Sequence, residues 1–144
     1  MIVLDSYAVL ALLKDEPAAG RVQQLVEGEE ETVLTALGVA EVLDQLVRLV
    51  GADDEEAVLD LAQLGLAAPP PIEVEVALQA GLLRARHFHR KERAVSLADC
   101  VAAETARPAG FHLASADPHL LGLCRDEGIG VLPLPDRTGR TWVP

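Results

Sequence analysis

Short apolar runs rich in β-branched residues alternate along the chain with longer segments of helical periodicity, and this alternation constrains the fold more than any other feature. The apolar runs predict strands at residues 1–4, 32–35, 72–76, 111–114 and 129–134, the third of them at a sheet edge. Helical spacing predicts helices over residues 7–14, 16–26, 39–50, 53–65, 76–89 and 96–106, and a last helix that begins at Asp117-Pro118. Strands that alternate with helices pair in parallel, and helices cover both faces of the sheet. We therefore expect an α/β fold, a three-layer α/β/α sandwich with a short, mainly parallel sheet of about five strands.

The length of 144 residues predicts a single domain that spans residues 1–144, because domains usually contain roughly 100–200 residues. Half of the residues are apolar, which excludes a disordered chain. The four aromatic side chains are too few for an RNA-binding sheet that stacks bases on rows of aromatic rings. The core must therefore be aliphatic.

No stretch of the sequence has the length and composition of a membrane span. The longest uncharged segment, Leu61–Ile72, contains three prolines and is too short to cross a bilayer. Asp5 interrupts the first apolar run before it could form the hydrophobic region of a signal peptide. Cys100 and Cys124 are not spaced like metal ligands and fit a reducing compartment. We expect a soluble cytoplasmic protein with no membrane partner.

The formal net charge of −11 would ordinarily disfavour a nucleic-acid partner, because binding to phosphates depends largely on Lys and Arg. The charge is distributed unevenly: residues 1–83 contain three basic and sixteen acidic side chains, and residues 84–144 contain nine basic and seven acidic ones. Five basic side chains form a stripe within ten residues: Arg84, Arg86, Arg90, Lys91 and Arg93. This basic stripe could bind RNA phosphates, although a helix end that complements the macrodipole would carry the same residues.

Four acidic residues follow predicted strands or lie near the helix ends at the same edge of the sheet. Asp5 and Asp117 follow the first and fourth strands, whereas Glu41 and Asp99 lie near the starts of helices. Each has an ordinary alternative explanation. Asp5 and Asp117 could be helix N-caps, Glu41 could lie on a solvated helix face, and Asp99 could form a capping interaction with Ser96.

Taken together, the four acids point to a metal site, because ligands of open parallel sheets bind beyond the carboxyl ends of the strands. Clustered carboxylates are costly unless a cation neutralises them or some of them bind protons. Oxygen ligands without His or Cys suit Mg²⁺ or Mn²⁺, and none of the four histidines has the spacing of a zinc ligand pair. Such a metal ion can activate water and stabilise the leaving oxygen of a phosphodiester. The pattern therefore predicts hydrolysis of phosphodiester bonds.

Four segments of the sequence, IVLDSYAVLALLKDEP, TALGVAEVLDQL, VSLADCVAAETA and HLASADPHLLGL, resemble the four acidic blocks of PIN-domain ribonucleases. Their order and the chain length most resemble the VapC-type toxins of bacterial toxin–antitoxin pairs, and the resemblance extends from Met1 to about Pro135. The resemblance implies a Mg²⁺- or Mn²⁺-dependent endoribonuclease that acts on RNA. It also implies a homodimer and inhibition by a cognate antitoxin protein whose tail enters the active site.

The resemblance also assigns roles to residues of this chain. The acids that match the four blocks, and would be catalytic, are Asp5, Glu41, Asp99 and Asp117. Of these, Asp5 and Asp99 would hold the metal ion, with Asp117 and Glu41 able to contribute through water. Ser6 and Ser115 would support the site.

Other α/β proteins with acids at strand ends fit the sequence less well. A phosphoacceptor receiver needs an acidic pair after the first strand, where this chain has Ser6 and Tyr7, and a Lys after the last strand. A haloacid-dehalogenase-like phosphatase needs Asp at position 7. The remaining alternative is a PIN-like module that binds RNA or protein without turnover.

Overall fold

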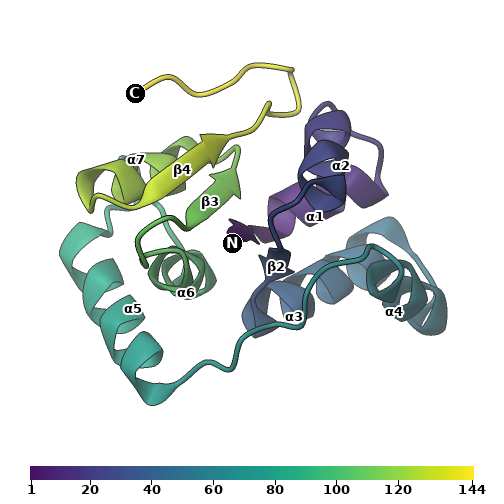
Figure 1. Cartoon of the computed structure of the whole chain (residues 1–144), viewed down its shortest axis with the longest axis horizontal. Helices are drawn as coiled ribbons and strands as arrows, with labels where there is room; N and C mark the ends of the chain where they lie inside the picture. The colour runs from purple at the N-terminus through teal and green to yellow at the C-terminus, as the bar shows by residue number, and fades with distance from the viewer.

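The computed structural model describes residues 1–144 and contains one parallel sheet whose four strands lie in the order β2-β1-β3-β4 (Figure 1). The strands are β1 (Ile2–Leu4), β2 (Thr32–Leu34), β3 (His112–Ser115) and β4 (Gly130–Pro133). Strand β1 lies in the middle, with Ile2 beside Thr32 of β2 on one side and beside His112 of β3 on the other. The α/β class and the parallel sheet are confirmed.

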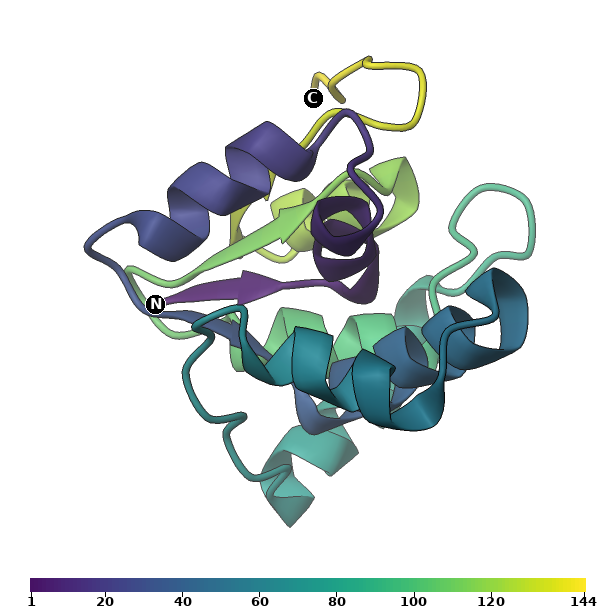
Figure 2. The same cartoon turned by 90° about the vertical axis from the view of Figure 1, so that its right-hand side faces the viewer.

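The helices form two groups, one on each face of the sheet (Figures 1 and 2). The first group consists of α1 (Ser6–Leu13), α2 (Ala19–Glu27), α3 (Ala36–Gln45), the π-helical turn η1 (Leu46–Val50) and α4 (Asp54–Ala62). The second group consists of α5 (Val74–His87), α6 (Leu97–Thr105) and α7 (Pro118–Asp126). No helix is long and apolar enough to cross a membrane.

The core is aliphatic and divided by the sheet, as the alternation of side chains along a strand requires. Ile2 and Leu4 of β1 pack into the cluster that contains α1 to α4, whereas Val3 packs into the cluster with α5 to α7. Leu113 and Ala114 of β3 divide in the same way. Both faces of β1, β2 and β3 are therefore largely buried, which explains their continuous apolar runs, whereas the edge strand β4 is only partly buried.

The edge strand expected at residues 72–76 is wrong, because α5 begins at Val74. The short alternation of valines and acids there resembles a strand, but Val76, Ala80 and Leu83 recur at helical spacing and pack in the cluster that contains α6. Burial of this helical face outweighs the local alternation. This connection pairs with the sheet edge only through an isolated parallel bridge from Ala67 to Val33 of β2.

Candidate active site

Asp5 lies where the central strand β1 ends and α1 begins, and local structure fixes its position. Its Oδ1 atom accepts a hydrogen bond of 2.8 Å from the backbone N–H of Ala8, so it is the N-cap of α1. Its own N–H donates to the carbonyl of Ala114 in β3, at 3.2 Å. The N-cap interpretation is therefore correct.

The side chain of Asp5 is buried, with 7% of the residue exposed. Burial raises its pKa from 3.8 to about 7, and the neighbouring carboxylates of Asp99 and Asp117 act in the same direction. Hydrogen bonds from Ser115 and from the N–H of Ala8 oppose this rise. Asp5 is thus a buried acid in a negative environment, which a cation would relieve.

Asp99 lies in the first turn of α6 and forms a reciprocal capping box with Ser96. The N–H of Asp99 donates to Ser96 Oγ at 3.0 Å, and Asp99 Oδ2 accepts from the N–H of Ser96 at 2.8 Å. The structure gives Oδ1 of Asp99 no hydrogen bond. Burial is the main reason that the pKa of Asp99 is raised, and the charge of Asp117 adds to it against the Ser96 bonds.

Glu41 is held in α3 on the opposite side of the cleft. The Ser6 hydroxyl, from the first turn of α1, donates to Glu41 Oε2 at 3.3 Å. Burial raises the pKa of Glu41, and the charge of Asp99 raises it further against the Ser6 bond. Asp5, Ser6, Glu41 and Asp99 line one small cleft in which no basic side chain takes part.

Asp117 stands beside this cleft, as the N-cap of α7. Its Oδ1 accepts from the N–H of His119 at 2.8 Å, and its own N–H donates to Ser115 Oγ at 2.9 Å. Ser115 is fully buried and also bonds to Asp5, so it connects the two acids. Asp117 does not line the cleft but a neighbouring hollow that it shares with Tyr7.

The charges of the four acids influence one another, but the acids do not form a complete coordination site for a metal ion. No three acidic, histidine or cysteine side chains stand close enough together to surround a metal ion. Mg²⁺ usually retains several waters and binds through one or two carboxylates together with substrate phosphates. The carboxylate of Asp5 and the unbonded Oδ1 of Asp99, in a cleft without basic side chains, fit that kind of binding.

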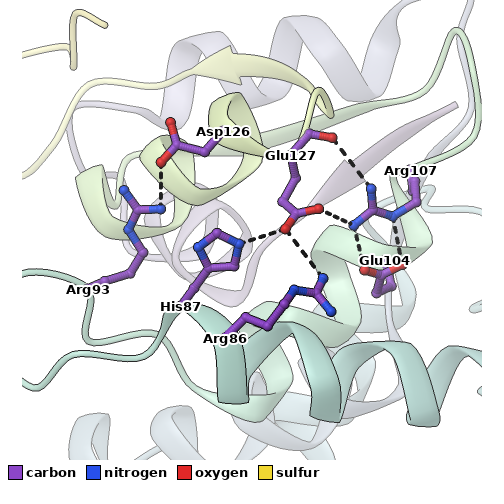
Figure 3. A network of polar contacts seen from close by, with 7 residues as sticks. All are labelled: Arg86, His87, Arg93, Glu104, Arg107, Asp126 and Glu127. Carbon is purple, nitrogen blue, oxygen red and sulfur yellow. Dashed lines mark hydrogen bonds and ion pairs between the residues drawn. The ribbon is translucent and has the colours of Figure 1, made fainter.

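The basic stripe, by contrast, is largely engaged within the protein. Arg84 donates from Nε to the carbonyl of Val95 at 2.9 Å and lies 4.3 Å from the ring centre of Phe88. Arg93 pairs with Asp126 of α7 at 2.8 Å (Figure 3).

Glu127, which follows α7, contacts Arg86 of the stripe and two basic side chains outside it (Figure 3). It contacts Arg86 at 3.4 Å, His87 at 2.6 Å and Arg107 at 3.1 Å. These contacts connect the ends of α5, α6 and α7 and hold the pKa of Glu127 below its ordinary value, chiefly through His87. Arg84, Arg90 and Lys91 of the stripe form no ion pair, and only Arg90 and Lys91 also form no side-chain hydrogen bond.

Two features near the cleft were not predicted from the sequence. Thr35 is the buried N-cap of α3 and accepts from the N–H of Gly38 at 3.0 Å. Its signal was a hydroxyl residue directly after a strand, as Asp5 follows β1. The second feature is a contact between the Tyr7 hydroxyl and the carbonyl of Pro135, at 3.1 Å, and no local pattern indicates it.

Comparison with known proteins identifies the family. The family model of the PIN domain matches residues 2–125. No curated protein matches the chain. One similar structure is the crystal structure of VapBC2 from Rickettsia felis bound to a DNA fragment from the VapBC2 promoter. A chain in it has a TM-score of 0.67 at 15% identity, over 93% of this chain and 99% of that one. The crystal structure of FitAcB from Neisseria gonorrhoeae contains a chain with a TM-score of 0.66 at 21% identity, over 92% of this chain and 96% of that one. The fold, the order of the acidic blocks and the match over residues 2–125 agree, and the chain belongs to the PIN domain family.

Proposed function

We propose that this PIN-domain protein is a single-domain, cytoplasmic endoribonuclease that depends on Mg²⁺ or Mn²⁺ and serves as the toxin of a toxin–antitoxin pair. The observation that carries the proposal is a group of acids at one edge of the sheet whose pKa values are raised by burial and by one another's charges. Asp5, Glu41 and Asp99 all have raised pKa values, and no basic side chain lines their cleft. Members of the PIN family are generally nucleases, which supports the same activity here.

In the proposed mechanism, Asp5 and Asp99 hold the metal ion, and Glu41 and Asp117 contribute through water. When bound, the metal ion supplies activation of water and stabilisation of the leaving oxygen. Ser6 orients Glu41 by its hydrogen bond, and Ser115 keeps Asp5 and Asp117 at a fixed separation. Burial of Asp5 lets it retain a proton near neutral pH while no cation is present.

The test compares the cleavage of a mixed pool of RNA by the wild type and by Asp5→Asn and Asp99→Asn. We expect both variants to lose cleavage with Mg²⁺ and with Mn²⁺ while their circular dichroism spectra remain native. Asp60→Asn, which changes an exposed acid on α4, is the matched control and should cleave normally. Unchanged cleavage in Asp5→Asn or Asp99→Asn would refute the assignment. RNA binding by the wild type without cleavage under both metals would favour a binding module without turnover.

A groove between α3, η1 and α4 supports the expectation of an antitoxin partner. The groove has a volume of about 330 Å³ and is lined by three apolar side chains, Leu43, Val47 and Val58, and by three charged ones, Asp44, Arg48 and Asp54. Val58 is 54% exposed, so an antitoxin segment could reach its side chain. If an antitoxin segment binds there, Val58→Glu should weaken binding of the co-expressed antitoxin and leave RNA cleavage by the free protein unchanged.

The outer face of α5 supports the expected homodimer. Val74, Leu78 and Leu82 recur at intervals of one helical turn and are 75%, 55% and 55% exposed. Glu75 lies near the start of this helix and Arg86 near its end, so two antiparallel copies would place opposite charges together. Light scattering should give about twice the 15.3 kDa mass of one chain for the wild type and for Leu59→Asp, an equally exposed control, and the single mass for Leu78→Asp.

A further inference from the structure

A hollow beside Asp117 lies next to the acidic cleft but has a different character. It has a volume of about 310 Å³ and is lined by Tyr7, Ala116, Asp117, Asp136, Arg137 and Thr138. That volume is at the lower end of the roughly 300–1,000 Å³ of small-ligand sites. A site of this volume can hold a small ligand such as one nucleotide unit.

Two segments distant in the sequence form the walls of the hollow. Tyr7 belongs to the first turn of α1, two residues after Asp5, and its hydroxyl donates to the carbonyl of Pro135. The segment after β4 thereby contacts the first turn of α1.

The loop that carries Arg137 is held rigid from within. Asp136 Oδ1 accepts hydrogen bonds from the N–H of Thr138 at 2.8 Å, from the Thr138 hydroxyl at 2.6 Å and from the N–H of Arg140 at 3.0 Å. Gly139 adopts a φ of 83°, which a residue with a side chain rarely does, and completes the tight turn. Arg137 is therefore presented on an ordered loop, which lowers the entropic cost of binding a ligand.

Arg137 is the only basic side chain that lines either the hollow or the acidic cleft. Its side chain is 70% exposed, and its nearest carboxylate, Glu16, lies at 3.6 Å. Glu16 faces the Nε atom of Arg137 with Oε2, whereas its Oε1 atom pairs with Lys14 at 2.9 Å. The two terminal nitrogens of the Arg137 guanidinium form no hydrogen bond or ion pair and can donate to an external anion.

We propose that this hollow binds the nucleotide next to the phosphodiester that is cleaved, with Arg137 on its phosphate and the Tyr7 ring against its base. The inference rests on the proposed function, because a nucleotide site beside the acids has a role only if RNA is the substrate. A guanidinium forms two parallel hydrogen bonds to a phosphate, and aromatic rings stack on bases of any identity. The hollow would then supply the affinity for RNA that the acidic cleft lacks.

The experiment measures the affinity of a labelled single-stranded RNA of twelve nucleotides by fluorescence anisotropy, in Mg²⁺ and in the Asp99→Asn background. We expect Arg137→Ala to weaken binding about tenfold. It should also reduce the salt slope, which is the slope of log affinity against log salt concentration, by about 0.7, the value for one lost phosphate contact on a single strand. Arg140→Ala removes the same charge from the same loop but outside the hollow, and should change affinity less than twofold.

A second pair of variants tests the ring. Tyr7→Phe keeps the ring and should retain affinity, whereas Tyr7→Leu should weaken binding by about fivefold or more. In the otherwise unmodified enzyme, Arg137→Ala should raise KM and leave kcat at saturating RNA within twofold.

Equal losses of affinity for Arg137→Ala and Arg140→Ala would overturn the inference, because the effect would then be one of net charge. An Arg137→Ala variant that binds RNA normally but binds the antitoxin more weakly would also overturn it and assign the hollow to the antitoxin. The binding assay does not require turnover. A wild type that binds RNA through Arg137 but does not cleave it would refute the proposed nuclease and leave the nucleotide site intact.

Discussion

Replacing Asp5 by Asn should stabilise the protein at alkaline pH in the absence of divalent cations. The folded state raises the pKa of Asp5 from 3.8 to about 7. The native chain therefore retains a proton on Asp5 that the unfolded chain releases between these two pH values. Stability must then fall as the pH rises from about 4 to about 7, since the native state is the one that binds the extra proton.

The size of the effect follows from the burial of Asp5. Moving this pKa from 3.8 to about 7 corresponds to about 4 kcal/mol. An Asn side chain preserves the cap on Ala8, because Asn and Asp are about equally good N-caps, but it does not ionise. Asp5→Asn should therefore match the wild type near pH 4 and exceed its unfolding free energy by up to about 4 kcal/mol at pH 8.

The assay is urea unfolding, followed by far-UV circular dichroism, at a series of pH values in EDTA. Glu41 and Asp99 are present in both proteins, so the difference between wild type and variant reports Asp5 together with its charge coupling to its neighbours. Addition of Mg²⁺ at a hundred times its Kd should restore about 2.7 kcal/mol to the wild type and much less to the variant. A difference that stays constant from pH 4 to pH 8 would refute the argument that burial of this carboxyl is costly.

Three further changes have defined outcomes. Gly38→Ala should lower the unfolding free energy by about 1–2 kcal/mol, because the added Cβ would lie 2.5 Å from Leu34 Cδ1. This clash should outweigh the better helix propensity of Ala, and a rise in the Tm measured by thermal unfolding would contradict it. Glu127→Gln should cost about 1–2 kcal/mol at neutral pH, and this loss should disappear as the pH falls below 4.5, since the native contacts lower the pKa of Glu127; urea unfolding at both pH values measures it. Arg90→Glu combined with Lys91→Glu should leave Tm unchanged, and if both residues bind phosphate it should reduce the salt slope of RNA binding by about 0.7 for each contact. A slope equal to that of the wild type would exclude them from the interface.

The sequence predicted the strands that are buried on both faces, because a continuous run of apolar β-branched residues has few alternatives in a chain of this class. It also placed Asp5 and Asp117 at the carboxyl ends of strands, where the structure has them as N-caps. It failed at residues 72–76, where the local alternation was real but burial against α6 depended on residues further along the chain. Tertiary contacts decided between strand and helix there.

The basic stripe shows a second limit of sequence reasoning. Clustering along the chain left open whether these residues bind phosphate or complement a helix end, and in the structure Arg86 and Arg93 pair with Glu127 and Asp126, more than thirty residues away. The segment around Arg137 gave no such signal, because a single arginine in a loop has no pattern. Arg137 comes close to Asp117 only because β4 pairs with β3, which places the loop after β4 beside α1. Long-range pairing therefore decided which cations are free.

The central position of β1 has a consequence for the order in which the chain can mature. This strand is the first to be synthesised, but its second neighbour, β3, begins only at His112. Until then Asp5 lacks the backbone carbonyl of Ala114 and the hydroxyl of Ser115, and Asp117 does not yet exist. A chain interrupted between Asp99 and β3 already contains Asp5, Glu41 and Asp99, but it lacks two of the four strands and Asp117. The surroundings of the first acid in the chain are therefore completed only by residues more than a hundred positions later.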